Sequence, residues 1–81
     1  MTSPITAVAM DRMNRALGPR DAARYAQDAF TRLGRSELDT ADELLRFAEV
    51  ILAMSAGNFV LESVGRALKV TAILRGAREV A

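Results

Sequence analysis

The segment NFVLESVGRALKVTAILR, residues 58–75, contains the pattern that decides the fold of this 81-residue chain. Its apolar side chains recur with the period of an α-helix, and no alternating strand pattern competes with it. At about 100° per residue, eight small or apolar side chains fill one arc of this helix: Val60, Leu61, Val64, Ala67, Leu68, Thr71, Ala72 and Leu74. Phe59, Val70 and Ile73 lie outside the centre of that arc. Because a surface helix of a small monomer needs one apolar stripe, this surplus predicts a second packing surface.

Two helices are predicted at the beginning of the chain. Ser3-Pro4 is a typical helix start, because a serine side chain caps free N–H groups and proline fits the first helical position. At Gly18-Pro19 the glycine ends the first helix and the proline opens the second. Gly34 then ends the second helix.

The third helix has two overlapping start signals. Ser36 precedes Asp39 by three residues, which is the spacing of a capping box. Thr40 precedes Glu43 by the same interval. We place the start near residue 38, and Asn58 caps the fourth helix. The four predicted helices span about residues 4–17, 19–33, 38–55 and 58–75.

These helices predict a single all-α domain over residues 1–81, folded as a compact antiparallel bundle of four short helices. An extended helical hairpin is the alternative. Residues 77–81 are expected to form a frayed tail. A domain of this size buries only about 60–65% of the surface of its unfolded chain, so its core is marginal. With no cysteine for a disulfide, additional stability has to come from packing or association.

The composition argues against catalysis. The chain has no His and no Cys, which removes the commonest general base, the commonest transition-metal ligand and every thiolate. Asp42 and Glu49 share one face of the third helix, but nothing apolar surrounds that face, so we interpret it as solvated acidic surface. No glycine-rich phosphate loop is present. We therefore predict a protein that is not an enzyme and has no cofactor or metal.

The net charge is only +1, but charge is segregated along the chain. Residues 1–36 carry six arginines against three aspartates, and residues 37–55 carry five carboxylates against one arginine. An acidic helix between basic ones, with complementary charge inside one bundle or between subunits, is the simplest interpretation. Arg20 and Arg24 share a face that could neutralise phosphates, so a small DNA-binding regulator is one alternative. The neighbouring Asp21 and the lack of interleaved aromatic residues argue against a nucleic-acid partner.

No membrane span is expected, because the sequence has no run of about 18 apolar residues. Residues 1–15 also lack the basic region and apolar core of a signal peptide. We therefore expect a cytoplasmic protein. Arginine in large excess over lysine, together with abundant alanine, suggests a bacterial source with a GC-rich genome.

The second half of the chain shows a partial resemblance to a known family. A first helix holds Leu44-Leu45, a break follows near Gly57, and a second helix holds Val60-Leu61-Glu62, Ala67, Lys69 and Ile73-Leu74. This pattern resembles the C-terminal half of type III secretion inner-rod subunits and of flagellar rod-junction subunits. The glutamine expected soon after the paired leucines is absent here. The resemblance implies a small, enzymatically inert helical hairpin that polymerises through wide apolar faces.

The interpretation we favour is a non-enzymatic protein–protein interaction module. It self-associates, as a homodimer, or docks on a heterologous protein through its third and fourth helices. We expect the interface to contain the residues that carry the apolar surplus: Val50, Met54, Phe59, Val70 and Ile73. A type III secretion rod-type structural subunit and a small DNA-binding regulator are the alternatives.

Overall fold

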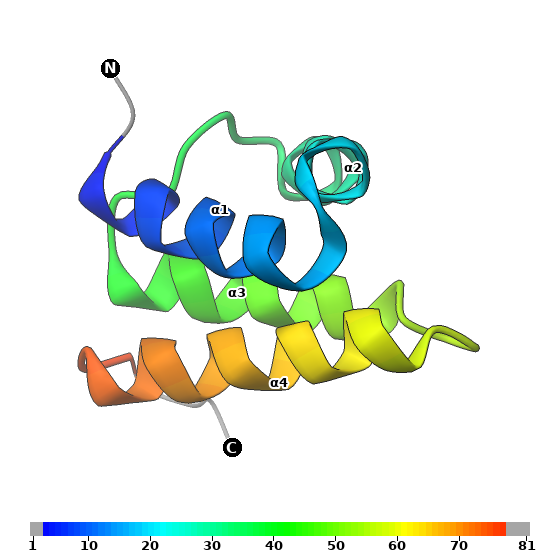
Figure 1. The fold of residues 1–81 in the computed structure, drawn as a ribbon. Coiled ribbons are helices and arrows are strands. Elements are labelled where there is room, and N and C mark those ends of the chain that lie inside the picture. The colour runs from blue at the N-terminus through cyan, green and yellow to red at the C-terminus, as the bar shows by residue number, and fades with distance from the viewer. Residues whose placement is uncertain (1–2, 78–81) are drawn as a thin grey trace.

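The computed structural model describes residues 3–77, and these residues form four α-helices and no strand. The helices are α1 (Pro4–Leu17), α2 (Pro19–Leu33), α3 (Ala41–Ala53) and α4 (Phe59–Leu74). In Figure 1, α3 and α4 run antiparallel to each other, and α2 is seen almost end-on because it crosses the other helices. The prediction of an all-α domain is confirmed.

The described part of the chain is compact, with principal extents of 31 × 28 × 22 Å. The alternative of an extended helical hairpin is therefore wrong: α3 and α4 do form a hairpin, but α1 and α2 fold over it (Figure 1). Helix α2 is what departs from the predicted antiparallel bundle, because it crosses the other helices and does not run antiparallel to α1 (Figure 1). Figure 1 shows α1 and α3 running the same way, because the crossing helix α2 and the following linker return the chain to its starting side.

The first two helices begin and end where the sequence predicts. The Ser3 side chain accepts a hydrogen bond from the N–H of Thr6 and so caps α1. Gly18 ends this helix with a φ of 84°, a backbone conformation that residues other than glycine rarely adopt. Its N–H donates to Asn14 O over 2.9 Å. Gly34 ends α2 in the left-handed conformation.

The third helix begins later than predicted, at Ala41 in place of residue 38. Of the two possible capping boxes the chain uses the second, in which Thr40 and Glu43 satisfy each other's free backbone N–H groups. Helix α3 then ends at Ala53, slightly earlier than expected. Residues 35–40 instead form a linker that is held by α1.

This linker is fastened to the start of α1 by hydrogen bonds. The N–H of Leu38 donates to Thr6 Oγ1 over 2.7 Å, and both the Ser3 and Thr6 hydroxyls donate to Leu38 O. The backbone N–H of Ser3 donates to Glu37 Oε1 over 2.8 Å. As a result the Leu38 side chain is fully buried in the core without belonging to a helix.

The core lies between α3, α4 and α1. Its largest fully buried side chains are Phe47, Met13, Leu38, Leu44, Ile51, Leu61 and Leu68. Helix α2 contributes only the small residues Ala22, Ala26 and Ala29 to the buried set. Because small side chains fill little volume, most of the buried apolar volume comes from the other helices and the linker.

The buried face of α4 is turned by about 50° from the arc that its apolar pattern outlines. It consists of Leu61, Val64, Gly65, Leu68 and Ala72. The turn brings Gly65 against α3, where it has no side chain to obstruct close packing. Consequently Val60 and Leu74, which belong to the arc, are exposed.

The end of α4 differs from the expected frayed tail at one residue. Gly76 follows the helix with a φ of 100°, and the N–H of Ala77 donates to Ala72 O over 3.0 Å. Ala77 is buried, so it is part of the packed domain. Residues 78–81 lie outside the described part of the chain. Within residues 3–77, no helix has both the length and the apolar character needed to cross a membrane.

Candidate protein interface

The exposed large apolar side chains of the described residues all lie on α4. We call this set the outer face of α4: Phe59 (84% exposed), Leu74 (81%), Val70 (56%), Val60 (47%) and Ile73 (41%). Single exposed apolar residues are normal on a protein surface, but a concentration on one element marks an interaction site. The inner side of the same helix packs on α3 and α1.

The outer face follows the spacing of a helix-packing seam. Phe59, Ser63, Arg66, Val70 and Ile73 succeed one another at intervals of four, three, four and three residues. Residues at these intervals line up along one side of a helix and pack against a second helix in coiled coils. The two ends of the seam are apolar and its middle is polar.

A hollow of about 310 Å³ lies in the first half of this seam, lined by Phe59, Glu62, Ser63 and Arg66. These four residues stand at positions i, i+3, i+4 and i+7 of one helix, which is the arrangement that receives a side chain from a partner helix. Arg66 Nη2 and Glu62 Oε1 form an ion pair of 2.6 Å at its edge, in which the Arg66 side chain is largely exposed and the Glu62 side chain is partly buried.

A second hollow, of about 330 Å³, separates the outer side of α4 from α1. It is lined by Arg12, Arg15, Ala16, Ser63, Val64 and Ala67. The Arg15 guanidinium lies 3.2 Å from Asp11, so part of its charge is balanced within α1. The apolar face of α4 is thus bordered by a polar rim on the side of α1.

The structure brings together only three of the five residues that the sequence predicts for the interface. Phe59, Val70 and Ile73 are exposed on α4, as expected for interface positions. Val50 on α3 and Met54 at its end are partly buried and pack against the core. They fill the bundle itself and do not join the outer face of α4.

Val60 and Leu74 belong to the outer face but are missing from the predicted set. Both lie within the apolar arc of residues 58–75, and the sequence alone gives no sign that the helix is turned. The one available signal is Gly65, because a glycine in a helix interior costs about 1 kcal/mol relative to alanine and its presence suggests a close helix contact. A prediction that packed Gly65 against α3 would also have placed Leu74 on the exposed side of the helix.

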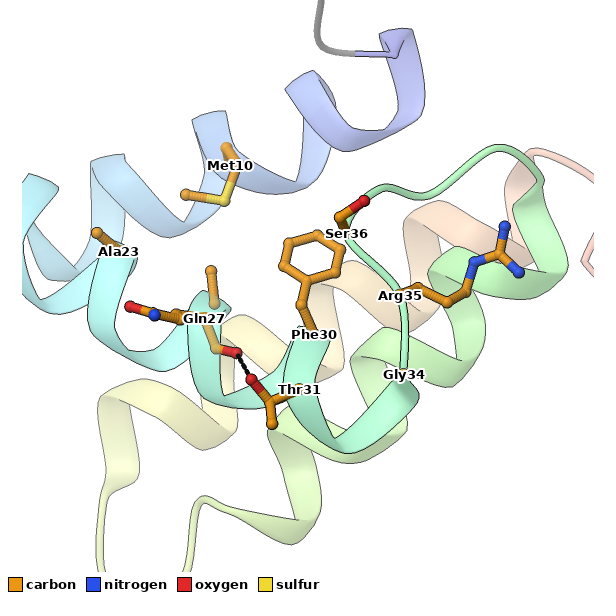
Figure 2. A pocket seen from close by; sticks show the side chains of 9 residues that line it. Met10, Ala23, Gln27, Phe30, Thr31, Gly34, Arg35 and Ser36 are labelled. Atoms are coloured by element: carbon orange, nitrogen blue, oxygen red, sulfur yellow. Dashed lines mark hydrogen bonds between the residues drawn. The ribbon is translucent and has the colours of Figure 1, made fainter.

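A further hollow, of about 720 Å³, lies elsewhere, between α1, α2 and the linker. Figure 2 shows the Phe30 ring rising from α2 toward Met10 of α1, with Gln27 and Thr31 on one side and Ser36 on the other. The Thr31 hydroxyl donates to Gln27 O over 2.9 Å, within its own helix. The Phe30 ring also packs on Phe47, with 5.0 Å between ring centroids.

This hollow contains no grouping suited to catalysis. Its one ionisable lining residue is Arg35, which Figure 2 shows pointing away from Phe30. The Arg35 guanidinium lies 2.7 Å from Glu43 and 3.3 Å from Asp39. Across residues 3–77, no three acidic, His or Cys side chains gather as a metal site would require. The hollow is a gap beside the small side chains of α2.

Comparison with known proteins gives no match: no protein family, no curated protein and no solved structure corresponds to this chain. The partial resemblance to secretion and flagellar rod subunits therefore stays a prediction.

Proposed function

We propose that this chain is a non-enzymatic protein-interaction module that docks through the outer face of α4. The observation that carries the proposal is the concentration of every exposed large apolar side chain of residues 3–77 on this one helix. Contact with a partner removes this surface from water, which is the dominant favourable term in most protein association. A cytoplasmic location and a homodimeric state remain predictions.

Polar side chains also border the face, as they do at the rim of a protein interface. Glu62 borders it on one side, and Arg12 and Arg15 of α1 border it on the other, while Arg66 lies in the polar middle of the seam. The rim is mixed in charge, which favours neither a purely anionic nor a purely cationic partner.

The arginines of α1 and α2 do not favour the DNA-binding alternative. Three of them lie within ion-pair distance of an aspartate about one helical turn away: Arg15 with Asp11, Arg24 with Asp21 and Arg32 with Asp28. A surface that binds phosphates needs a positive field, and the neighbouring carboxylates reduce it. The balance supports a protein partner.

The energy available on the face is large enough to matter. Full burial of one large apolar side chain contributes about 1.5–3 kcal/mol. Phe59 and Leu74 are more than four-fifths exposed, so almost all of that gain is still available to them. Association costs several kcal/mol in lost freedom, and the five residues of the outer face together offset it.

The test compares three forms of the full chain in the native cell. They are the wild type, the double variant Phe59→Ser/Leu74→Ser, and the control Arg20→Ser at an exposed position of α2. Each carries the same tag, is fixed to its neighbours with a short cross-linker and is recovered for mass spectrometry. Far-UV circular dichroism confirms that all three are equally helical.

We expect the wild type and Arg20→Ser to recover the same cross-linked protein. A second copy of the chain counts as such a protein. The double variant should lose it, because both substituted side chains are exposed and their loss leaves the core intact. Recovery of one identical set of proteins by all three forms would contradict the proposal.

A further inference from the structure

We infer that the protein seated on the outer face of α4 is a second copy of this chain, with the two α4 helices antiparallel about a two-fold axis between residues 66 and 67. The inference rests on the proposed function and names its partner. Three observations on α4 carry it: a hollow of matching spacing, the distribution of apolar residues along the seam, and the distribution of charge.

The hollow lined by Phe59, Glu62, Ser63 and Arg66 fits a side chain of the same helix. We place the two-fold axis of the antiparallel pair between residues 66 and 67. Each residue of one copy then faces a residue of the other copy, and the two residue numbers add up to about 133. Val70 of the second copy then lies opposite position 63, which is only about half a residue from the centre of the hollow near position 62.5. Val70 is 56% exposed and thus free to enter it.

The same register covers Phe59, the most exposed large apolar side chain of residues 3–77. Phe59 of one copy meets the surface formed by Val70, Ile73 and Leu74 of the other. By the two-fold symmetry this contact occurs twice, once at each end of the helix pair. The apolar ends of the seam thus bury each other on either side of Arg66, which lies nearest the axis.

Charge on the flank of the seam favours the antiparallel orientation. Arg66 does not distinguish the two orientations, because the two Arg66 residues lie side by side in a parallel pair and only about 1.5 Å apart along the axis in the antiparallel pair. Each Arg66 is paired with Glu62 of its own helix at 2.6 Å. Glu62 and Lys69 lie on the same flank of α4, and the antiparallel register brings Glu62 of one copy toward Lys69 of the other.

The size of the seam indicates a weak dimer. Helix α4 has 16 residues and is therefore about 24 Å long. A pair of such helices buries less than the roughly 800 Å² per partner of a standard complex, which is typical of reversible association. We therefore expect dissociation in the micromolar range, with monomer and dimer both present in ordinary solutions.

The experiment uses engineered disulfides, since the chain has no cysteine to interfere. Ser63→Cys and Val70→Cys are each oxidised alone and as an equal mixture, and intact mass spectrometry tells the three possible disulfide-linked dimers apart. Ala23→Cys, exposed on α2, measures random oxidation. In the antiparallel pair, position 63 of one copy faces position 70 of the other. The two positions 63, like the two positions 70, are about 10 Å apart along the axis, which is too far for a disulfide.

We expect the mixed Ser63→Cys and Val70→Cys dimer to form several-fold more than either single-variant dimer, which should stay at the level of Ala23→Cys. Efficient dimers of each variant alone would show a parallel pair and overturn the inference. No dimer above the Ala23→Cys level, with the mass of a monomer at all concentrations, would overturn it as well. In that last case, capture of a different protein that depends on Phe59 and Leu74 leaves the proposed function standing.

Discussion

Gly65 of α4 faces Leu52 of α3 so closely that a Cβ atom on the glycine would lie 2.8 Å from Leu52 Cγ and 2.9 Å from Leu52 Cδ2. Real Cβ atoms almost never come this near to another carbon. The contact therefore fixes how α4 is turned on its long axis. With Gly65 directed at α3, the opposite side of the helix presents Phe59 and Val70 to solvent.

Replacing this glycine is expected to destabilise the bundle. Gly65→Ala gains about 1 kcal/mol of helix propensity but crowds the contact with α3, which costs about 1–3 kcal/mol. Because Leu52 Cγ is close to its backbone and can move little, we expect the crowding to exceed the gain and the free energy of unfolding to fall by about 1 kcal/mol. Urea unfolding followed by circular dichroism measures it.

The control is the same substitution made beside a smaller neighbour. In a Leu52→Ala background the two nearest crowding atoms are gone and only Ile51 Cγ2, at 3.3 Å, stays close, so Gly65→Ala should raise the free energy of unfolding through helix propensity. Both measurements belong in the Phe59→Ser/Leu74→Ser variant, where association does not add to stability. An equal effect of Gly65→Ala in both backgrounds would show that the close contact does not determine the packing.

Much of this fold can be predicted from the sequence, because its determinants are local. Ser3, Gly18 and Asn58 set helix ends through their own backbone or side-chain chemistry, and all three are found at the predicted ends. The helical period of the apolar residues likewise gives an all-α fold.

The rest depends on contacts between distant residues. The choice of Thr40 over Ser36 as the cap of α3 follows from Leu38, which is drawn out of the helix by Thr6 of α1. The turn of α4, and with it the exposure of Leu74, follows from a contact with α3 that no local pattern shows. The surplus of apolar residues on the fourth helix was thus predictable from the sequence, but the set of residues that forms the outer face was not.

The linker should depend on the Thr6 hydroxyl. Thr6→Val keeps the shape of the side chain but leaves the buried N–H of Leu38 without its acceptor, which costs about 1–3 kcal/mol. We expect that loss in urea unfolding, together with faster hydrogen exchange at Leu38. Thr71→Val is the matched control, because the Thr71 hydroxyl bonds only to Ala67 O within its own helix. Equal losses for the two variants would contradict the role of Thr6.

The start of α3 should depend on Glu43. Its carboxylate accepts from the N–H groups of Asp39 and Thr40 and pairs with Arg35 at 2.7 Å. Glu43→Ala removes all three contacts and should lower the free energy of unfolding by about 1–2 kcal/mol. Glu43→Gln retains an acceptor for the cap and should lose less than half as much. A loss as large in Glu43→Gln would assign the stabilisation to the ion pair with Arg35.

Thermal stability should depend on protein concentration in the wild type only. Association stabilises the folded form by about 1.4 kcal/mol at roughly ten times the dissociation constant, which corresponds to a rise in Tm of roughly 5–10 °C for a domain of this size. In Phe59→Ser/Leu74→Ser the Tm should be constant across the same concentrations. Differential scanning calorimetry on dilution series of both proteins checks this, and parallel behaviour of the two would count against association through α4.

The most direct test asks whether Phe59 becomes covered. The chain has no tryptophan, so Phe59→Trp places a single reporter at the most exposed position of the outer face, and Ala23→Trp on α2 is the control. As concentration rises from low to high micromolar, the emission of Phe59→Trp should shift to shorter wavelength and become protected from iodide quenching, while Ala23→Trp stays unchanged. Emission of a fully solvated indole from Phe59→Trp at every concentration would contradict burial of this face by a second copy.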